Sequence, residues 1–402
     1  MDIISADSPC LCNTEKHTKS QGLTTITPFI LSSPSQVEND IPCCGPPAGP
    51  AASPHERPGY TICPFVENFI STPAGFIPRV KTKLSIRDYL STLLVRSNIG
   101  RNDYTIAPGL YAAGNPDKNS AVLVTANYKL TFDHVRKELK GIDAFILVLD
   151  TRGINVWCAA GKKTFGTEEL VNRIRITGLS KVVNHRNIIL PQLGAVGVSA
   201  IQVKKQSGFT VTWGPINAMD IPQFIANGLK AEPAMRRLTF NLTERLVLVP
   251  VEVSIALKPA IWITLTIAIL SGFGPGFFSF TALAHRGLAA AMVLISGIIA
   301  GAVLTPVLLP RLPGTLFSIK GTVAGFVLSL PTALGFAYHS GVSGVVGLIF
   351  MATAVSSWLA MNFTGATPFT SPSGVEKEMK RSMPFQIAGA IMGFVFWIVS
   401  AF

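Results

Sequence analysis

The stretch from Pro259 to Phe402 is almost free of charge, and this constrains the fold more than any other feature. It contains only eight charged residues, whereas the whole chain has 34 Lys and Arg and 22 Asp and Glu residues. The mean hydropathy of the chain is +0.43, which is high for a protein without a membrane part. A bilayer is the solvent that suits such a stretch, because it accepts apolar side chains on every face of a helix.

Five apolar runs in this region are each about long enough to cross a bilayer as a helix. Arg311 and Lys320 lie in one connecting loop and a basic cluster at 377–381 lies in another, so the positive-inside rule places both loops in the cytoplasm. Five spans then leave the N-terminal part in the cytoplasm and Phe402 outside, in a cytoplasmic-membrane protein without a visible signal peptide. The runs are Ala260–Leu283, Gly287–Leu309, Gly321–Tyr338, Gly344–Phe363 and Phe385–Phe402.

Residues 1–59 mix Ser, Thr, Pro and Gly with few large apolar residues, which predicts a disordered tail. The tail holds Cys10, Cys12, Cys43 and Cys44, at a spacing that fits neither a four-ligand zinc site nor an iron–sulfur run. These thiols are either incidental or capture a soft metal ion for delivery to another site, since thiolates select soft metals.

From residue 60 to residue 253, short β-branched runs alternate with helical stretches. This alternation predicts an α/β domain with a mostly parallel sheet. The net charge of +12 is scattered along the chain, so a nucleic-acid partner is not indicated. Expected strands are Ala121–Thr125, Ala144–Leu149, Asn187–Leu190, Phe209–Trp213 and Arg245–Val249, and expected helices are Leu130–Leu139, Thr167–Thr177 with Thr167 as N-cap, Val198–Lys205 and Asp220–Leu229.

Ligands of parallel α/β sheets bind at the carboxyl ends of the strands. Four segments should meet there: Thr125 with Asn127, then Asp150–Asn155, then Pro191–Gly197, then Trp213–Asn217. One crevice could hold all four. The glycines in these segments, Gly194, Gly197 and Gly214, either allow a large flat ligand to approach the backbone or are ordinary loop glycines.

The segment Asn155–Lys162, with the sequence Asn-Val-Trp-Cys-Ala-Ala-Gly-Lys, follows the second of these strand ends. It places a single soft thiol, Cys158, among small residues that could pack closely against a cofactor. Neither a P-loop nor a GxGxxG pattern occurs, and no His-Glu-x-x-His motif supports a zinc hydrolase. A thiol nucleophile assisted by the distant His185 is a weaker alternative. Taken alone, such a cysteine is more often a buried inert thiol.

Gly153–Lys162, followed by Thr164–Thr167 and preceded by Val122–Lys129, resembles the corrinoid-binding domain of the corrinoid iron–sulfur protein family. The Asn155–Lys162 octet, with five spans behind it, is similar more narrowly to the mercury-methylating corrinoid proteins of the HgcA type. The mutase motif Asp-x-His-x-x-Gly, which supplies an imidazole to cobalt, is absent, since Asp133-His134 does not complete it.

The resemblance implies a cap helix near 154–163 below a cobalamin-type corrinoid, with Cys158 as the lower axial ligand of cobalt. Trp157, Ala159 and Ala160 would shape the contact with the ring, Asn155 would orient the cap, and Thr125 would meet the cofactor from a strand end. The same resemblance implies that further residues bind the cofactor. They are Val156, Gly161 and Lys162 in the octet and Gly153, Gly194 and Gly214 outside it.

The activity that this resemblance implies is a corrinoid-dependent methyltransferase that passes a methyl group from cobalt to Hg(II), giving methylmercury. The transfer is formally that of a carbanion or of a radical. Reduction of cobalt implies a separate ferredoxin-like iron–sulfur protein, and a folate-type methyl donor acting through another protein is expected. Two alternatives stay open: a membrane-anchored corrinoid methyl carrier of one-carbon metabolism, and a transporter or metal-binding module in which the spans do the work.

Overall fold

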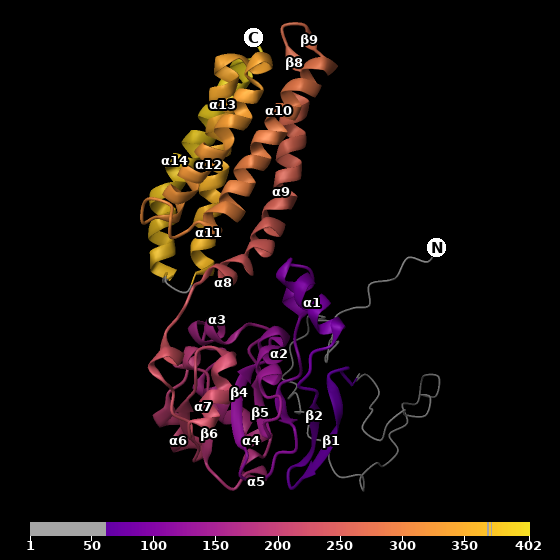
Figure 1. Ribbon diagram of the computed structural model, residues 1–402, viewed down its shortest axis with the longest axis vertical. Helices are drawn as coiled ribbons and strands as arrows, with labels where there is room; N and C mark the ends of the chain where they lie inside the picture. Colours follow the sequence, from indigo (N-terminus) through magenta and orange to yellow (C-terminus); the bar gives the residue numbers. More distant parts are fainter. Residues whose placement is uncertain (1–61, 368–369, 371) are drawn as a thin grey trace, which may run out of the picture. The chain divides into compact units, whose positions relative to one another are not determined.

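The computed structural model describes residues 62–367, 370 and 372–402, and these form two compact units (Figure 1). The first is made largely of residues up to Arg237 and holds a seven-stranded sheet. The second, Leu238–Phe402 together with Arg96–Ile99, contains five helices long and apolar enough to cross a membrane. The predicted fold class, an α/β domain followed by an all-α membrane domain, is confirmed. The predicted tail and its cysteines lie outside the described residues.

The sheet of the first unit has the strand order β1-β2-β3-β5-β4-β6-β7. Strands β5, β4, β6 and β7 are all parallel, whereas β3 is antiparallel to β5 and β1 is antiparallel to β2. Parallel neighbours need crossover connections, and here these are helical. The strands are β1 (Val66–Thr72), β2 (Gly75–Val80), β3 (Gly109–Ala113), β4 (Ala121–Ala126), β5 (Ala144–Leu149), β6 (Asn187–Leu190) and β7 (Thr210–Trp213).

Helices cover both faces of this sheet, and each face has its own hydrophobic core. Side chains alternate between the two faces along each strand. In β4, Val122 and Val124 join the core beneath α3, α4, α5 and α6, whereas Leu123 joins the core beneath α2 and α7. The helices are α1 (Ile86–Arg96), α2 (Lys129–Glu138), α3 (Val156–Gly161), α4 (Thr167–Ile176), α5 (Leu179–Val182), α6 (Ala200–Ser207) and α7 (Ile221–Ala226).

Two sequence expectations for this region are wrong. Arg245–Val249 is not a strand, because these residues belong to α8 (Leu242–Leu246) and the start of α9 (Val249–Leu270). An Asn241–Glu244 capping box begins α8. The main segment of the second unit starts at Leu238, whereas the first domain is expected from the sequence to end at residue 253. Thr167 is also not an N-cap. Gly166 occupies that position, and the Thr167 hydroxyl instead accepts a hydrogen bond from the Ser199 amide at 2.9 Å.

The five candidate spans agree with the number predicted, but the first is displaced toward the N-terminus. Its helix ends at Leu270, and a small hairpin of β8 (Phe273–Gly274) and β9 (Phe277–Phe278) interrupts the expected run Ala260–Leu283. Glycine and proline in this turn end the helix although the composition stays apolar. The spans are Leu242–Leu270, Phe280–Val307, Phe317–Gly335, Gly341–Phe363 and Ser373–Val399.

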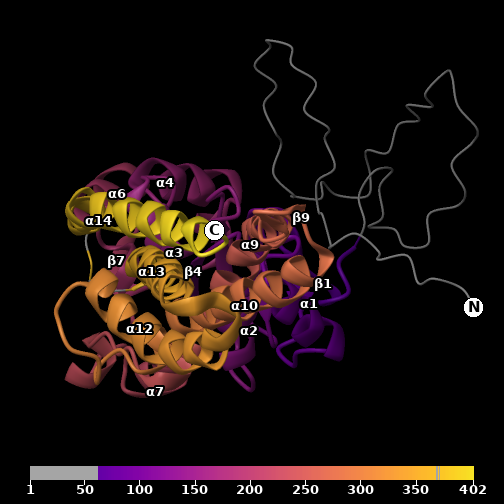
Figure 2. The same cartoon turned by 90° about the horizontal axis from the view of Figure 1, so that it is seen from above.

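Within the second unit, α13 (Ala337–Phe363) is the central helix and packs against α10 (Phe280–Ile298), α12 (Phe317–Gly335) and α14 (Pro372–Val399) (Figure 2). Small residues permit this packing: a Cβ on Gly347 would meet the Gly393 carbonyl of α14 at 2.7 Å. The one Arg of α10, Arg286, donates to the Trp397 carbonyl at 2.6 Å and lies over its ring at 4.6 Å. Trp397 is therefore a packing residue.

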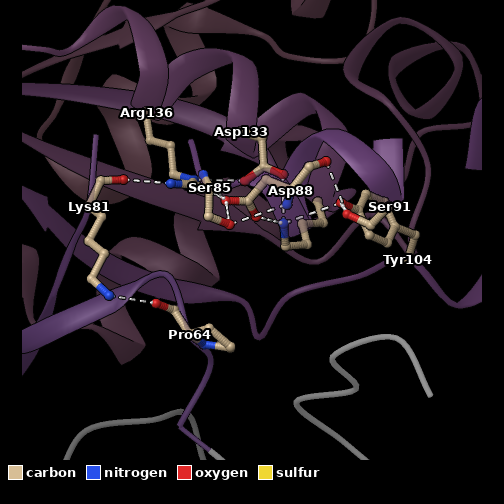
Figure 3. Close-up of polar contacts among 9 residues, drawn as sticks. Pro64, Lys81, Ser85, Asp88, Ser91, Tyr104, Asp133 and Arg136 are labelled. Carbon is tan, nitrogen blue, oxygen red and sulfur yellow. Dashed lines mark hydrogen bonds and ion pairs between the residues drawn. The ribbon is translucent and has the colours of Figure 1, made fainter. Parts of the chain in front are cut away.

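A buried network of charges fixes α1 to α2 in the first unit (Figure 3). The Lys129 ammonium donates to Asp88 at 2.8 Å and to Asp133 at 2.7 Å. Arg136 pairs with the same two carboxylates, at 3.1 Å to Asp88 and 2.7 Å to Asp133. Asp88 also accepts from the amide and hydroxyl of Ser85, which begins α1. Two cations and two carboxylates thus balance each other away from water.

The network lowers the pKa of Asp88 and raises the pKa of Lys129. Burial alone would raise the pKa of Asp88, but hydrogen bonds from Lys129 and Ser85 hold it well below its ordinary value of 3.8. Burial alone would lower the pKa of Lys129, but Asp133 and Asp88 raise it above its ordinary value of 10.5. Both groups therefore remain charged across the neutral range.

The network predicts a pH window for the stability of the first unit. A depressed Asp88 pKa stabilises the fold above the unfolded value of 3.8, and this contribution is lost as pH falls further. A raised Lys129 pKa stabilises the fold below 10.5, and this contribution is lost as pH rises further. We expect the stability difference between wild type and Asp88→Asn to be constant between these values and to shrink below the lower one. Hydrogen exchange of β4 amides at several pH values measures it, and a difference that grows with acidity would contradict the assignment.

Candidate functional site

The carboxyl ends of the parallel strands gather the segments that the sequence predicts to lie together. Asn127, just after β4, organises the loop after β5: its side-chain oxygen accepts from the Thr151 amide at 3.0 Å, the Thr151 hydroxyl at 2.8 Å and the Gly153 amide at 3.0 Å. Its amide nitrogen donates to Asp150 at 3.3 Å. This loop leads directly into α3, so one asparagine positions the entry of the Cys158 helix.

Helix α3 is short and begins at the predicted orienting residue. Asn155 is its N-cap, and the Asn155 side chain accepts a hydrogen bond from the Cys158 amide at 2.9 Å. Such a cap stabilises a helix start by about 1 kcal/mol, which matters in a helix of so few residues. Asn155 thus fixes the backbone of the residue that carries the thiol.

One face of α3 is exposed and the other is buried. Cys158 is an exposed free thiol, and Trp157, which is 37% exposed, lies beside it together with exposed Gly161 and Lys162. Val156, which is 7% exposed, faces the core. Cys158 is therefore not the inert buried thiol that such a residue often is, and its sulfur is available to a ligand.

Ala159 and Ala160 do not face outward with Cys158. They are 0% and 2% exposed and belong to the core beneath the sheet. The exposed face of α3 consists of Trp157, Cys158, Gly161 and Lys162, and contact of the two alanines with a ring stays a prediction. The alanines are small because the loop after β6 lies on them, and a Cβ on Gly197 would come within 3.0 Å of Ala160 Cα.

Gly197 offers a direct test of how α3 is seated. A Cβ there would lie 2.2 Å from the Phe165 carbonyl oxygen and 3.0 Å from backbone atoms of Ala160, so Gly197→Ala must displace α3. We expect a loss of about 1–3 kcal/mol in stability, measured by hydrogen exchange of α3 and β5 amides in the full chain. Gly161→Ala adds the same methyl group to α3 with no neighbour within 4 Å and should leave that stability unchanged within about 0.5 kcal/mol. Equal effects of the two substitutions would contradict the packing role of Gly197.

The other predicted glycines are also surrounded by protein atoms. A Cβ on Gly194 would meet the Phe165 ring at 2.6 Å, and one on Gly214 would meet Ile189 at 3.0 Å. Gly153 has a φ of +70°, a conformation that favours glycine, in the loop before α3. These contacts explain the glycines by packing and turn geometry, and their contact with a cofactor stays a prediction.

Thr125 lies near the end of β4 and is 1% exposed, yet its hydroxyl has no hydrogen-bond partner among the described residues. Its neighbours Val124 and Ala126 join the core that contains α3, so alternation along the strand turns Thr125 to the opposite face of the sheet. A buried hydroxyl without a partner is uncommon and calls for an explanation such as a bound ligand.

The sequence did not identify Gln192 and Arg236 as residues that join the last two loops. The Arg236 guanidinium donates to the Gln192 side chain and, at 3.2 Å, to the Trp213 carbonyl. The Gln192 amide donates to the Pro215 carbonyl at 3.5 Å. Arg236 lies outside the predicted elements, and no motif marks it. Only the folded structure shows that it links the loop after β6 to the end of β7.

His185 does not support the thiol-nucleophile alternative. It precedes β6, and its ring lies 2.9 Å from the Ser120 carbonyl at the start of β4. Cys158 follows β5, and β4, β5 and β6 run parallel. The imidazole and the thiol thus lie at opposite ends of the parallel strands. Among the described residues, no group of three or more His, Cys, Asp or Glu side chains is arranged to hold a metal ion.

Comparisons with known proteins find similarity over part of this unit. Residues 84–225 match the protein family described as CO dehydrogenase/acetyl-CoA synthase delta subunit. The chain is also similar to acetyl-CoA decarbonylase/synthase complex subunit gamma of Methanopyrus kandleri, 33% identical over 127 residues, and of Methanocaldococcus jannaschii, 34% identical over 129 residues. These matches cover 31% and 32% of this chain and only 27% and 26% of the relatives. The chain thus spans about a quarter of their length.

Proposed function

We propose, from the match of residues 84–225 to the CO dehydrogenase/acetyl-CoA synthase delta family, that the first unit is a corrinoid-binding domain for methyl transfer. The observation that carries this proposal is the exposed Cys158 on a short capped helix at the carboxyl ends of parallel strands. The five apolar helices would hold the domain at a membrane. We propose that the domain lies on the cytoplasmic side. The expectation of two basic loops is corrected, since Lys320 lies in α12 and the basic cluster at 377–381 lies in the first turns of α14. These residues still gather near helix starts, and the positive-inside rule places such ends in the cytoplasm.

The residues present fit a corrinoid. Cys158 offers a soft sulfur donor on an open face, and a coordinating thiol is deprotonated by the metal itself. Thr125 has a buried hydroxyl without a partner among the described residues, but it faces away from the core that contains α3, so its contact with the corrinoid stays a prediction. When bound, the corrinoid supplies a cobalt atom that carries a methyl group and gives it to an acceptor.

The chain's own residues would then act as follows. Cys158 would supply a thiolate to the cobalt, with Asn155 holding the backbone at that position. Trp157, on the same face, would pack against the flat ligand and exclude water from the sulfur. Lys162 would reach polar groups at the ligand's rim. Axial ligand identity is one of the protein's main controls on a cofactor, so a thiolate would enrich cobalt in electrons.

Two acceptors are compatible with this site, and different observations favour them. The relatives belong to acetyl-CoA decarbonylase/synthase complexes, and this favours a membrane-anchored methyl carrier of one-carbon metabolism. The Asn155–Lys162 octet, its exposed thiol and the five spans favour Hg(II), because a strong thiolate donor would not be needed by an ordinary carrier. We propose Hg(II) as the acceptor, with the carrier as the alternative.

Both versions require partners. Transfer of the methyl group to Hg(II) as a carbanion or radical would require electrons to restore the cofactor, and we propose a separate ferredoxin-like iron–sulfur protein as their source. The methyl donor is proposed to be folate-type and to act through another protein. The relatives are subunits of acetyl-CoA decarbonylase/synthase complexes, and this agrees with a domain that works with other proteins.

A single-turnover assay separates the acceptors. The full chain in membranes is loaded anaerobically with methylcobalamin, washed, and divided between Hg(II) and buffer, and both methylmercury and the methyl group retained are measured. The proposal expects methylmercury in proportion to the bound corrinoid. Retention of the methyl group in the presence of Hg(II), with transfer on addition of an acetyl-CoA synthase, would replace mercury by the one-carbon alternative.

A further inference from the structure

Helix α1 is oriented opposite to an ordinary surface helix. Its large apolar side chains point outward, with Ile86 79%, Leu90 56% and Leu93 60% exposed, and Tyr89 and Leu94 extend the same face at 58% and 48%. These positions follow the helical period, so they form one continuous stripe. A stripe of this kind is unfavourable in water and marks a surface that is covered in the working protein.

The opposite side of α1 holds the helix in this orientation. Asp88 is 9% exposed and is bound by Lys129 and Arg136, and Val95 is 3% exposed and packs with Tyr104. The buried ion pairs thus fix the polar side of α1 inward. This network cannot be satisfied if the helix rolls to bury its leucines, because Asp88 would then leave both of its cations.

The surroundings of the stripe are basic. Lys83 and Arg87 are exposed at the start of α1. The only acidic residue between Lys81 and Asn102 is Asp88, and it is buried within the network. An apolar stripe with tyrosine and flanking cations, on a helix without an exposed carboxylate of its own, is the composition of a helix that lies in the interface of an anionic bilayer.

A short linker joins the first unit to the first candidate membrane span. The first unit ends at Arg237 and the first candidate span begins at Leu242, so residues 238–241 connect them. Four extended residues cover at most roughly 14 Å. A domain tethered this closely to a membrane meets lipid at high effective concentration, so a modest interfacial affinity is sufficient for stable contact.

We infer that α1 is a membrane-surface helix, which inserts its Ile86–Leu94 stripe among anionic lipids while Lys83 and Arg87 contact their phosphates. The occupant of the stripe is thus the bilayer, and not a second protein. This contact would fix the orientation of the first unit above the membrane. It concerns residues outside the Cys158 site and holds whichever acceptor that site serves.

Photo-crosslinking of the full chain tests this inference. A benzophenone side chain is introduced at position 90 or 93, with Gln206 on the exposed side of α6 as the reference position. The protein is reconstituted in vesicles of phosphatidylcholine with or without phosphatidylglycerol, and adducts are identified by mass spectrometry. We expect lipid adducts at positions 90 and 93, several-fold above position 206. Adducts to protein, either the chain's own helices or a second copy, would overturn the inference.

Charge reversal tests the two basic residues beside the stripe, Lys83 and Arg87. Lys83→Glu with Arg87→Glu should lower the yield of lipid adducts at position 90 at least about ten-fold in anionic vesicles, because each basic residue near such a surface contributes to binding. Lys204→Glu with Lys205→Glu makes the same change of net charge on α6 and should leave the yield unaltered. Equal losses from both pairs, or equal yields in neutral and anionic vesicles, would refute an anionic lipid partner.

Discussion

Cys158→Ala should abolish methyl transfer to Hg(II), lowering the rate at least about a hundred-fold, while corrinoid still binds. The side chain is exposed on α3 and absent from both cores, so its loss removes the cobalt donor without opening a cavity. Removing an interaction that acts at the reacting centre costs far more in rate than in stability, and losses of two to three orders of magnitude are usual for a single essential group. Methylmercury formed per bound corrinoid is the measurement.

The other cysteine of the described region provides the control. Cys63 is 5% exposed and packs in the core with Phe65 and Phe132. Cys63→Ala should therefore retain methyl transfer and lower only stability, by about 1 kcal/mol. Full activity in Cys158→Ala, or equal loss in both variants, would show that the thiol of α3 is not the ligand.

Lys129→Met should be the most destabilising single substitution in the first unit outside its hydrophobic cores. Lys129 is 4% exposed, and it lies between Asp88 and Asp133, which keep only Arg136 as a counterion once the ammonium is gone. Removing one partner from a buried ion pair costs about 3–5 kcal/mol, because the remaining charge is left uncompensated. Hydrogen exchange of β4 and β5 amides in the full chain reports this loss for the first unit alone.

Lys137→Met is the matched control on the same helix. Lys137 is exposed and pairs with Glu138 at 3.5 Å on the surface, so its removal should change stability by less than about 0.5 kcal/mol. Similar exchange rates in the Lys129 and Lys137 variants would mean that the network does not stabilise the unit. A selective loss of protection in α1 with Lys129→Met would show in addition that the network holds this helix.

The parts of the fold that follow simple periodicity were predictable from the sequence. Strands β5 and β6 coincide with the ranges expected from their β-branched runs, and the five spans follow from length and composition. Strand β3 was not predicted, because Gly-Leu-Tyr-Ala-Ala lacks β-branched residues and owes its strand to the neighbours with which it pairs. Helix α1 was not predicted, although its apolar residues follow the helical period. The sequence alone does not show that this apolar side faces outward.

The candidate site was predictable in its location but not in the direction of its side chains. Cys158 and its Asn155 cap lie where the octet indicates. Ala159 and Ala160 face the core instead. Successive residues of a helix are rotated by about 100°, so these alanines lie about 100° and 200° around the axis from Cys158. The glycines around the site pack against Phe165 and Ala160, a tertiary relation that no local pattern encodes.

X-ray absorption at the cobalt edge tests the central claim most directly, on the full chain loaded anaerobically with cobalamin in detergent or lipid. The account predicts a sulfur ligand at cobalt in the wild type and in Cys63→Ala, and its loss in Cys158→Ala at equal corrinoid content. A wild-type protein that takes up no corrinoid, or that holds cobalt with nitrogen and oxygen ligands alone, would contradict the assignment of Cys158 as the axial ligand.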